Sequence, residues 1–291
     1  MRVPMSVCKL MVMVPAMLVS GVLVLMVLAV LPPVLGLLGF LACGVVLVVV
    51  ASGGLEGPAV RLLTRAREAT EGERAVLAPV LVAQGGTGMP AVALYVRRAP
   101  HASTPPALVV GTSSLVVTPW LVEATYRGWI TREEATAVVL HAAGRHCAGR
   151  HRLEVAVLAA TTPWRAVSAV ARGVGRSFAW FPFMRFAWAL RGFVGAVAVV
   201  QSAVEGRAVY GAIAGVFVAL TYLVPAAGRA RERHLDVEGD RLVIARGLGE
   251  TLAGLLRRSG IPVRLERLQG LENRPPAQPV PVLQLAAFSP N

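Results

Sequence analysis

The longest uncharged stretch of the chain covers 46 residues, from position 10 to position 55. A helix needs about 20 apolar residues to cross a bilayer, so this stretch has room for two crossings. Pro32 and Pro33 lie near its midpoint, where a pair of helix breakers permits a tight turn. We therefore predict a membrane hairpin over residues 1–55, with spans at 10–31 and 34–51. A cleaved secretory signal is the competing interpretation, although the apolar part of such a signal covers only about 7–15 residues.

A second apolar pair follows late in the chain, and we predict a second hairpin there, over residues 178–227. Residues 208–227 contain no charged side chain. Residues 178–204 are apolar and aromatic but include Arg185 and Arg191, so this span is expected to begin near Arg191, with both arginines reaching the interface. With 55% hydrophobic and only 15% charged residues, the composition also favours a membrane protein with four spanning helices.

Arginines are numerous between the two hairpins, whereas the turn at Pro32 and Pro33 has no charge. By the positive-inside rule, the intervening region and both termini are expected on the cytoplasmic side of the cell membrane. The net charge of +13 is better explained by this topology and by anionic lipid than by nucleic acid, because aromatic residues do not alternate with the basic ones. We therefore expect membrane lipid as a partner and no nucleic acid.

Residues 56–177 have the patterning of a cytoplasmic α+β region that is mostly helical. Short helices are expected at 58–67 and 75–83. Strands are expected at 92–97 and on both sides of a glycine turn within 107–117, which together predict a small antiparallel sheet. Thr131 and Glu134 have capping-box spacing and predict a helix start at 131, with the helix continuing to 151.

The remaining segments are assigned from composition. The chain after His151 is amphipathic and basic, is interrupted at Pro163 and Trp164, and is expected on the membrane surface. Residues 228–272 are expected to return to the cytoplasmic region, with a charged helix over 228–258. The proline-rich tail, residues 273–291, is expected to be unstructured. The three cysteines form no plausible disulfide framework.

The helix at 131–151 has the frame of a zinc-hydrolase motif without the residues that perform hydrolysis. In H-E-x-x-H, two histidines four residues apart bind one metal, and the glutamate activates the metal-bound water. The chain has His141, then Ala142 in the glutamate position and Arg145 in the second histidine position. If His146 is taken instead as the second histidine, alanine occupies the position of the first. His141 and His146 are about 140° apart around a helix, so they cannot grip one ion together.

This order of segments resembles the HtpX-like and CAAX-prenyl-protease-like family of integral-membrane zinc metallopeptidases. The resemblance rests on residues 132–144 and on residues 231–247, which match the helix that supplies a third ligand. It implies that His141 and Asp236 are the remaining metal ligands, with His146 as an alternative ligand. It also implies supporting roles for Asp240 and Glu134.

We interpret the chain as a pseudoprotease that has lost peptidase activity and binds membrane proteins or extended peptides without cleaving them. One hypothesis is that Arg145 pairs with Asp236 in the place of the metal. The alternative is that Arg145 and His146 are simply polar residues on the cytoplasmic side. No cofactor is expected, or zinc if the chain is active. The alternatives are an active zinc endopeptidase with a non-standard site, and a structural membrane protein whose motif resemblance is accidental.

Overall fold

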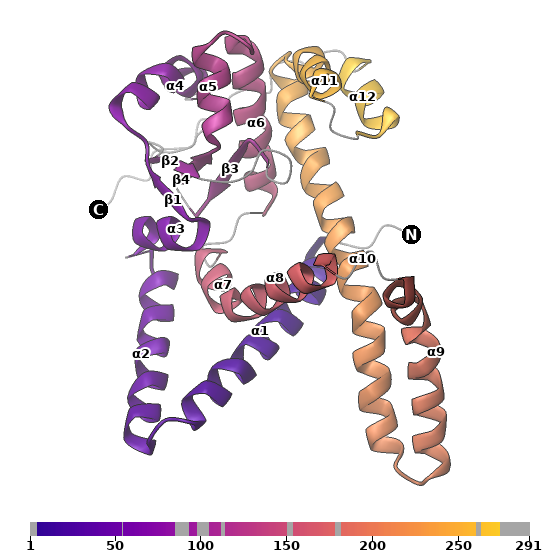
Figure 1. The fold of residues 1–291 in the computed structure, drawn as a ribbon. Coiled ribbons are helices and arrows are strands. Elements are labelled where there is room, and N and C mark those ends of the chain that lie inside the picture. Colours follow the sequence, from indigo (N-terminus) through magenta and orange to yellow (C-terminus); the bar gives the residue numbers. More distant parts are fainter. Residues whose placement is uncertain are drawn as a thin grey trace, which may run out of the picture. The chain divides into compact units, whose positions relative to one another are not determined.

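The computed structural model describes residues 5–53, 55–84, 93–97, 105–111, 114–149, 154–177, 182–259 and 263–273. The chain is mostly helical with one small sheet (Figure 1). It divides into two compact units. Unit 1 comprises Met1–Val48 and Ala156–Arg233, and unit 2 comprises Val49–Val155 and His234–Asn291. Apart from Asn273, the predicted tail lies outside the described residues.

Unit 1 contains the apolar helices. They and the helices between them are α1 (Met5–Ala29), α2 (Pro33–Ala51), α7 (Glu154–Ala160), α8 (Thr162–Ser177), α9 (Pro182–Val204) and α10 (Ala208–Ala245). Three of these, α1, α2 and α10, are long and apolar enough to cross a membrane. The apolar part of α9 is shorter, Ala189–Val204. The structure thus supports a membrane protein with three candidate spans, and the fourth span stays a prediction.

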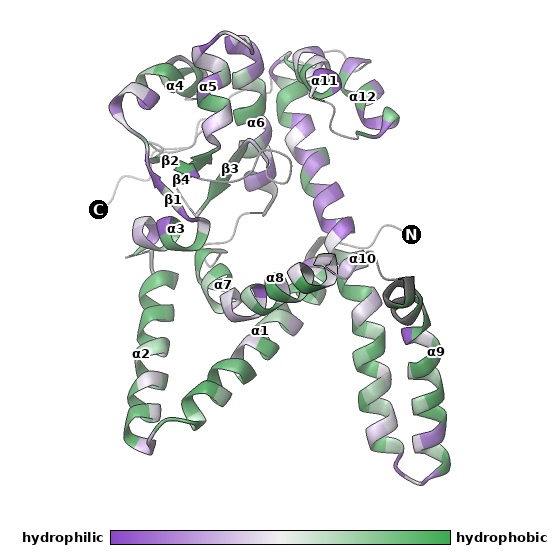
Figure 2. Cartoon of the chain, in the orientation of Figure 1, coloured by the Kyte–Doolittle hydropathy of each residue, from purple (hydrophilic) through white to green (hydrophobic). Residues whose placement is uncertain are grey.

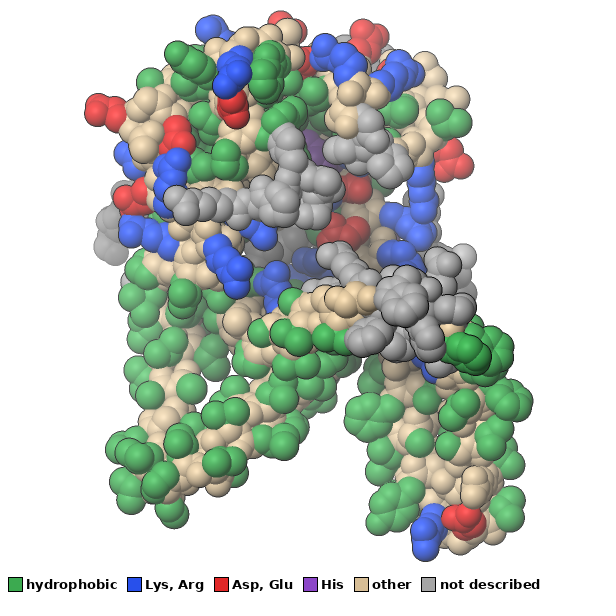
Figure 3. All heavy atoms as spheres, in the orientation of Figure 1, with side chains coloured by type: hydrophobic (Ala, Val, Ile, Leu, Met, Phe, Trp, Pro, Cys, Tyr) green, Lys and Arg blue, Asp and Glu red, His purple; other side chains and the backbone are tan. Residues whose placement is uncertain are grey.

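The first hairpin forms as predicted, with α1 ending at Ala29 and α2 beginning at Pro33. Glycine makes the close approach of the two helices possible. A Cβ atom at Gly36 would lie 2.9 Å from the carbonyl oxygen of Leu28, and one at Gly39 would lie 2.8 Å from the Leu28 side chain. The hydropathy colouring shows both helices as predominantly apolar (Figure 2). Their side chains present a hydrophobic surface (Figure 3).

Helix α10 is longer than the sequence predicted: the span expected at 208–227 and the first part of the charged helix expected over 228–258 form one continuous helix. Its 38 residues correspond to about 57 Å, nearly twice the thickness of a bilayer core. The apolar residues 208–227 are continuous with a charged second half (Figure 2). We treat only the apolar part as membrane-spanning. The helix ends at Ala245 because Gly247 adopts a left-handed conformation with φ +72, and a separate helix, α11 (Gly249–Arg258), follows.

Unit 2 is built on a four-stranded sheet with the order β1-β2-β4-β3. The strands are β1 (Ala66–Glu68), β2 (Ala93–Arg97), β3 (Ala107–Val110) and β4 (Ser114–Val117). The three strands predicted from alternation are confirmed, but the prediction of an antiparallel sheet is wrong. Strand β4 pairs parallel to β2, with Tyr95 opposite Val116, while the β1–β2 and β3–β4 pairs are antiparallel.

Strand β1 replaces the end of the helix predicted over 58–67. The helix that forms, α3 (Glu56–Thr64), stops at Arg65, whose φ of 52° is left-handed. The chain then extends, and Ala66–Glu68 pairs with β2. The next predicted helix is confirmed in a longer form, α4 (Glu71–Gln84).

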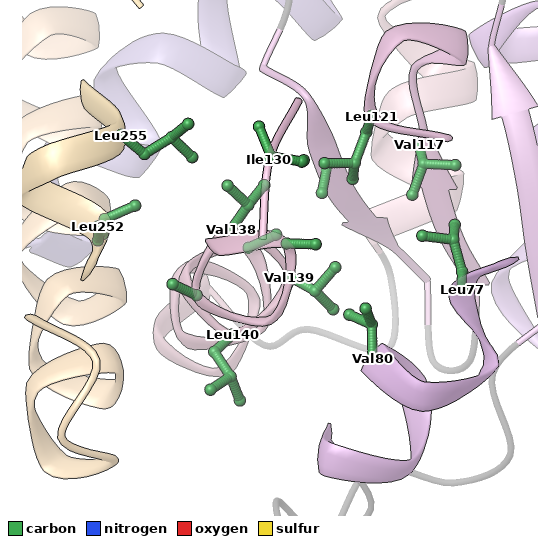
Figure 4. Close-up of a cluster of buried hydrophobic side chains, with 14 of the residues drawn as sticks. Leu77, Val80, Val117, Leu121, Ile130, Val138, Val139, Leu140, Leu252 and Leu255 are labelled. Carbon is green, nitrogen blue, oxygen red and sulfur yellow. The ribbon is translucent and has the colours of Figure 1, made fainter. Parts of the chain in front are cut away.

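The core of unit 2 surrounds helix α6 (Arg132–Gly149), which packs against α4, β3 and α11. Figure 4 shows side chains from several elements in this core, among them Leu77, Val117, Leu121 of α5 (Pro119–Tyr126), Val139 and Leu252. Residues 135–144 of α6 are buried except for His141, which is half-buried. The last helix, α12 (Leu265–Glu272), joins this core through Leu268 and Leu271.

Candidate functional site

The start of α6 is set by the predicted capping box, which is confirmed. The backbone N–H of Glu134 donates to Thr131 Oγ1 at 3.2 Å, and the N–H of Thr131 donates to Glu134 Oε2 at 2.9 Å. Glu134 also accepts a hydrogen bond from Arg258 of α11. Its carboxylate is therefore engaged at the beginning of the helix, about two turns before His141.

Within unit 2, helix α6 approaches the second half of α10 at two glycines. A Cβ atom at Gly144 would lie 2.9 Å from both the backbone carbonyl oxygen of Glu238 and the Cα atom of Gly239. A Cβ atom at Gly239 would lie 2.5 Å from His141 Nδ1. The backbones can meet this closely only because neither position has a side chain. This close approach brings the polar residues of α6 onto the acidic residues of α10.

His141 lies between two carboxylates of α10. Its Nδ1 is 3.2 Å from Asp240 Oδ1, and its Nε2 is 3.7 Å from Asp236 Oδ1. Nδ1 is buried and, within the described part of the chain, makes no hydrogen bond despite the short distance to Asp240. The three residues that the resemblance assigned to a metal centre and its support therefore do come together.

Arg145, one turn after His141, forms the predicted ion pair with Asp236. Its Nη1 donates to Asp236 Oδ1, and both side chains are half-buried. The guanidinium thus binds the carboxylate that the resemblance assigned to zinc. Ala142, which the resemblance places where the general base would be, is buried and carries no polar group.

His141, Arg145, Asp236 and Asp240 form a cluster together with a second arginine, Arg267, which the sequence did not predict. Arg267 of α12 donates to Asp240 from Nε at 2.7 Å and from Nη2 at 2.8 Å, in a two-pronged contact. Its Nη1 is 3.6 Å from Asp236 Oδ2, and its Nη2 is 3.4 Å from His141 Nε2. Leu268 and Leu271 pack into the core and hold α12 there. In the sequence, this apolar pair was the only local sign that the neighbouring Arg267 would lie close to the core.

Charge sets the protonation of the cluster. Burial alone would raise the pKa of Asp236 and of Asp240, but the His141 contact and the neighbouring guanidinium groups outweigh it and lower both pKa values below the usual range. Burial would conversely lower the pKa of Arg267, but the two carboxylates raise it. The carboxylates of Asp236 and Asp240 thus face the guanidinium groups of Arg145 and Arg267, and these four charges cancel.

The arrangement does not fit a zinc ion as the side chains lie. Zinc in hydrolases is bound by about three imidazole or carboxylate groups whose lone pairs converge on one point. Here both carboxylates accept from arginines, and two cationic groups lie where a cation would have to bind. Among the described residues, no group of three or more His, Cys, Asp or Glu side chains is arranged to hold a metal ion. The alternative ligand His146 is buried further along α6.

Comparisons with known proteins found no match: no family model, no curated protein and no solved structure matches the chain. The relationship to membrane metallopeptidases therefore stays a prediction from the residues themselves. What the structure adds is the geometry of those residues.

Proposed function

We propose that this chain is a membrane-anchored, catalytically silent relative of the membrane zinc metallopeptidases, which binds extended peptide segments of membrane proteins without cleaving them. The observation that supports it is the cluster in which Arg145 and Arg267 bind the two carboxylates around His141. In this proposal, unit 2 would lie on the cytoplasmic side of the membrane and would be anchored by four membrane helices.

Loss of activity follows from what peptide hydrolysis needs. A metallopeptidase needs a metal to polarise the carbonyl group and an unpaired carboxylate to take a proton from water. Asp236 and Asp240 are paired to arginines and have lowered pKa values, which makes them weak bases. Ala142 offers no base at all.

Binding without cleavage is supported by strand β3. It is an edge strand whose described partner is β4, and it packs against α6. Its sequence, Ala-Leu-Val-Val, has neither the charge nor the proline that usually protects an edge from pairing. An extended apolar peptide could therefore add to the sheet through its backbone.

An active enzyme is the second candidate, and one observation favours it. His141 Nδ1 and Nε2 lie within 3.7 Å of Asp240 and Asp236, so one imidazole and two carboxylates would face each other if both arginines moved away. Such a set has the donor types that zinc accepts.

Zinc content of the detergent-purified protein, measured by elemental mass spectrometry beside His141→Ala, separates the two candidates. We expect no stoichiometric zinc in either sample. Near one zinc per chain, lost in His141→Ala, would overturn the silent assignment.

Peptide capture tests the binding half of the proposal. The probe is a fluorescent, extended apolar peptide added to the protein in detergent. We expect binding without cleavage, weakened about tenfold by Leu108→Lys at the β3 edge. The control is Leu62→Lys on α3, at a side chain that is 81% exposed. Equal binding by the two variants, or cleavage of the peptide, would contradict the proposal.

A further inference from the structure

Helix α8 of unit 1 separates its charged from its apolar residues around the axis. At about 100° per residue, positions 165, 172 and 176, all arginine, fall within an arc of about 40°. Trp164, Val167, Val170 and Val174 fall within about 120° on the opposite side. The helix contains no Asp or Glu. It is therefore amphipathic, and all of its charges are positive.

The apolar side of α8 is open within the described part of the chain. Val170 is 66% exposed, Val174 is 50% exposed, and Val167 and Trp164 are exposed as well. The helix is nevertheless held in unit 1, because it packs against α1 and the Trp164 N–H donates to Ser20 Oγ at 3.2 Å. Helix α1 is one of the candidate spans. The open apolar face is therefore attached to an element that meets lipid.

The chemistry of the two faces identifies what covers α8. Valines and a tryptophan suit the boundary between acyl chains and headgroups, and three arginines on the other face suit the phosphates of an anionic leaflet. A protein partner would have to provide both an apolar groove and acidic groups for the arginines. We propose that α8 lies in the membrane interface and binds anionic phospholipid. This inference is independent of the proposed peptide binding.

Depth measurement on the full chain tests this inference. A spin label is placed at Val170→Cys, with Cys8, Cys43 and Cys147 changed to Ser, in lipid discs of phosphatidylcholine with or without phosphatidylglycerol. Collisions with oxygen report lipid, and collisions with a water-soluble nickel chelate report solvent. We expect oxygen to dominate when phosphatidylglycerol is present. Solvent access should rise when it is absent, or when Arg165, Arg172 and Arg176 are all changed to Gln.

Matched controls keep the result interpretable. Changing the exposed arginines Arg74, Arg132 and Arg264 of unit 2 to Gln removes the same charge elsewhere and should leave the label depth unchanged. Domination by the nickel chelate in both kinds of disc would overturn the inference. So would a label shielded from both reagents, which means a protein partner, or a depth that is independent of lipid charge and of the three arginines.

Discussion

The two units place the same aliphatic residues in opposite ways. In unit 2, Leu121 is fully buried among residues of the core (Figure 4). In unit 1, Leu38 of α2 is 56% exposed, and most large apolar side chains of α1 and α2 are exposed as well. The difference indicates that the exposed side chains of unit 1 suit an apolar lipid environment, whereas the leucines of unit 2 are buried away from water.

The units also differ in what holds their helices together. In unit 1, α9 and α10 approach at glycines: a Cβ atom at Gly195 would lie 2.5 Å from the Val218 side chain. This is the kind of close backbone packing that replaces hydrophobic force in lipid. In unit 2, glycine contact at Gly144 and Gly239 is combined with a buried core and with the arginine cluster.

The largest expected difference between the units comes from shortening one leucine in each. Leu121→Ala in unit 2 should lower the free energy of unfolding by about 2–5 kcal/mol, because it leaves a cavity in a packed core. Leu38→Ala in α2 should change it by about 0.5 kcal/mol or less, since lipid fills the space. Hydrogen exchange of the full chain in lipid discs measures both, and similar losses would contradict the comparison.

The half-buried arginine cluster should contribute more to stability than an exposed ion pair of the same type. Arg267→Ala leaves the buried Asp240 without its donor and should cost about 1.5–3 kcal/mol in unit 2. The control is Arg257→Ala, which removes the exposed pair with Glu272 and should cost about 1 kcal/mol or less. Urea unfolding followed by hydrogen exchange of α6 checks this. Equal effects would mean that the cluster gives no stability of its own.

Adding one methyl group at the α6–α10 approach should also destabilise unit 2. A Cβ atom at Gly239 would lie 2.5 Å from His141 Nδ1, so Gly239→Ala should cost about 1–3 kcal/mol by overpacking. A Cβ atom at Gly254 of α11 would meet no described residue within 4 Å, so Gly254→Ala should stabilise the helix by about 0.4–1 kcal/mol. The two substitutions should thus shift thermal unfolding of unit 2 in opposite directions.

The smallest expected effect is a dependence on pH that is confined to unit 2. The folded-state pKa values of Asp236 and Asp240 lie below the unfolded value of about 3.9. Their contribution to stability is therefore complete above that pH and is lost as the pH falls through the folded values. Glu73, whose pKa is lowered to about 2 by hydrogen bonds from Arg67, adds to the same trend. Hydrogen exchange at pH 5 and about pH 3 measures it; Asp240→Asn should reduce the slope.

Local features of the fold were predictable, and contacts between distant segments were not. Thr131 and Glu134 fixed the start of α6 because a capping box needs only four residues. The parallel pairing of β2 with β4 was missed because alternation gives a strand but not its neighbour. The charged helix expected from residue 228 was given as a separate element, yet α10 passes through Gly228, since one glycine weakens a helix without ending it.

The candidate site shows the same division. The pairing of Arg145 with Asp236 followed from helix spacing together with the family resemblance. Arg267 did not follow, because it comes from a short helix with no motif, and only the folded chain brings it to Asp240. Its position depends on Leu268 and Leu271, which pack into a core that no local pattern describes.

The cluster around His141 also constrains the order in which the protein can be made. Its side chains come from α6, from the second half of α10 and from α12, and the stretch Ala156–Arg233 between the first two belongs to unit 1. During translation, α6 is synthesised first, the unit 1 stretch Ala156–Arg233 follows, and Arg267 is synthesised last. His141 and Arg145 are therefore without the carboxylates that bind them until α9 and the whole of α10 have been synthesised.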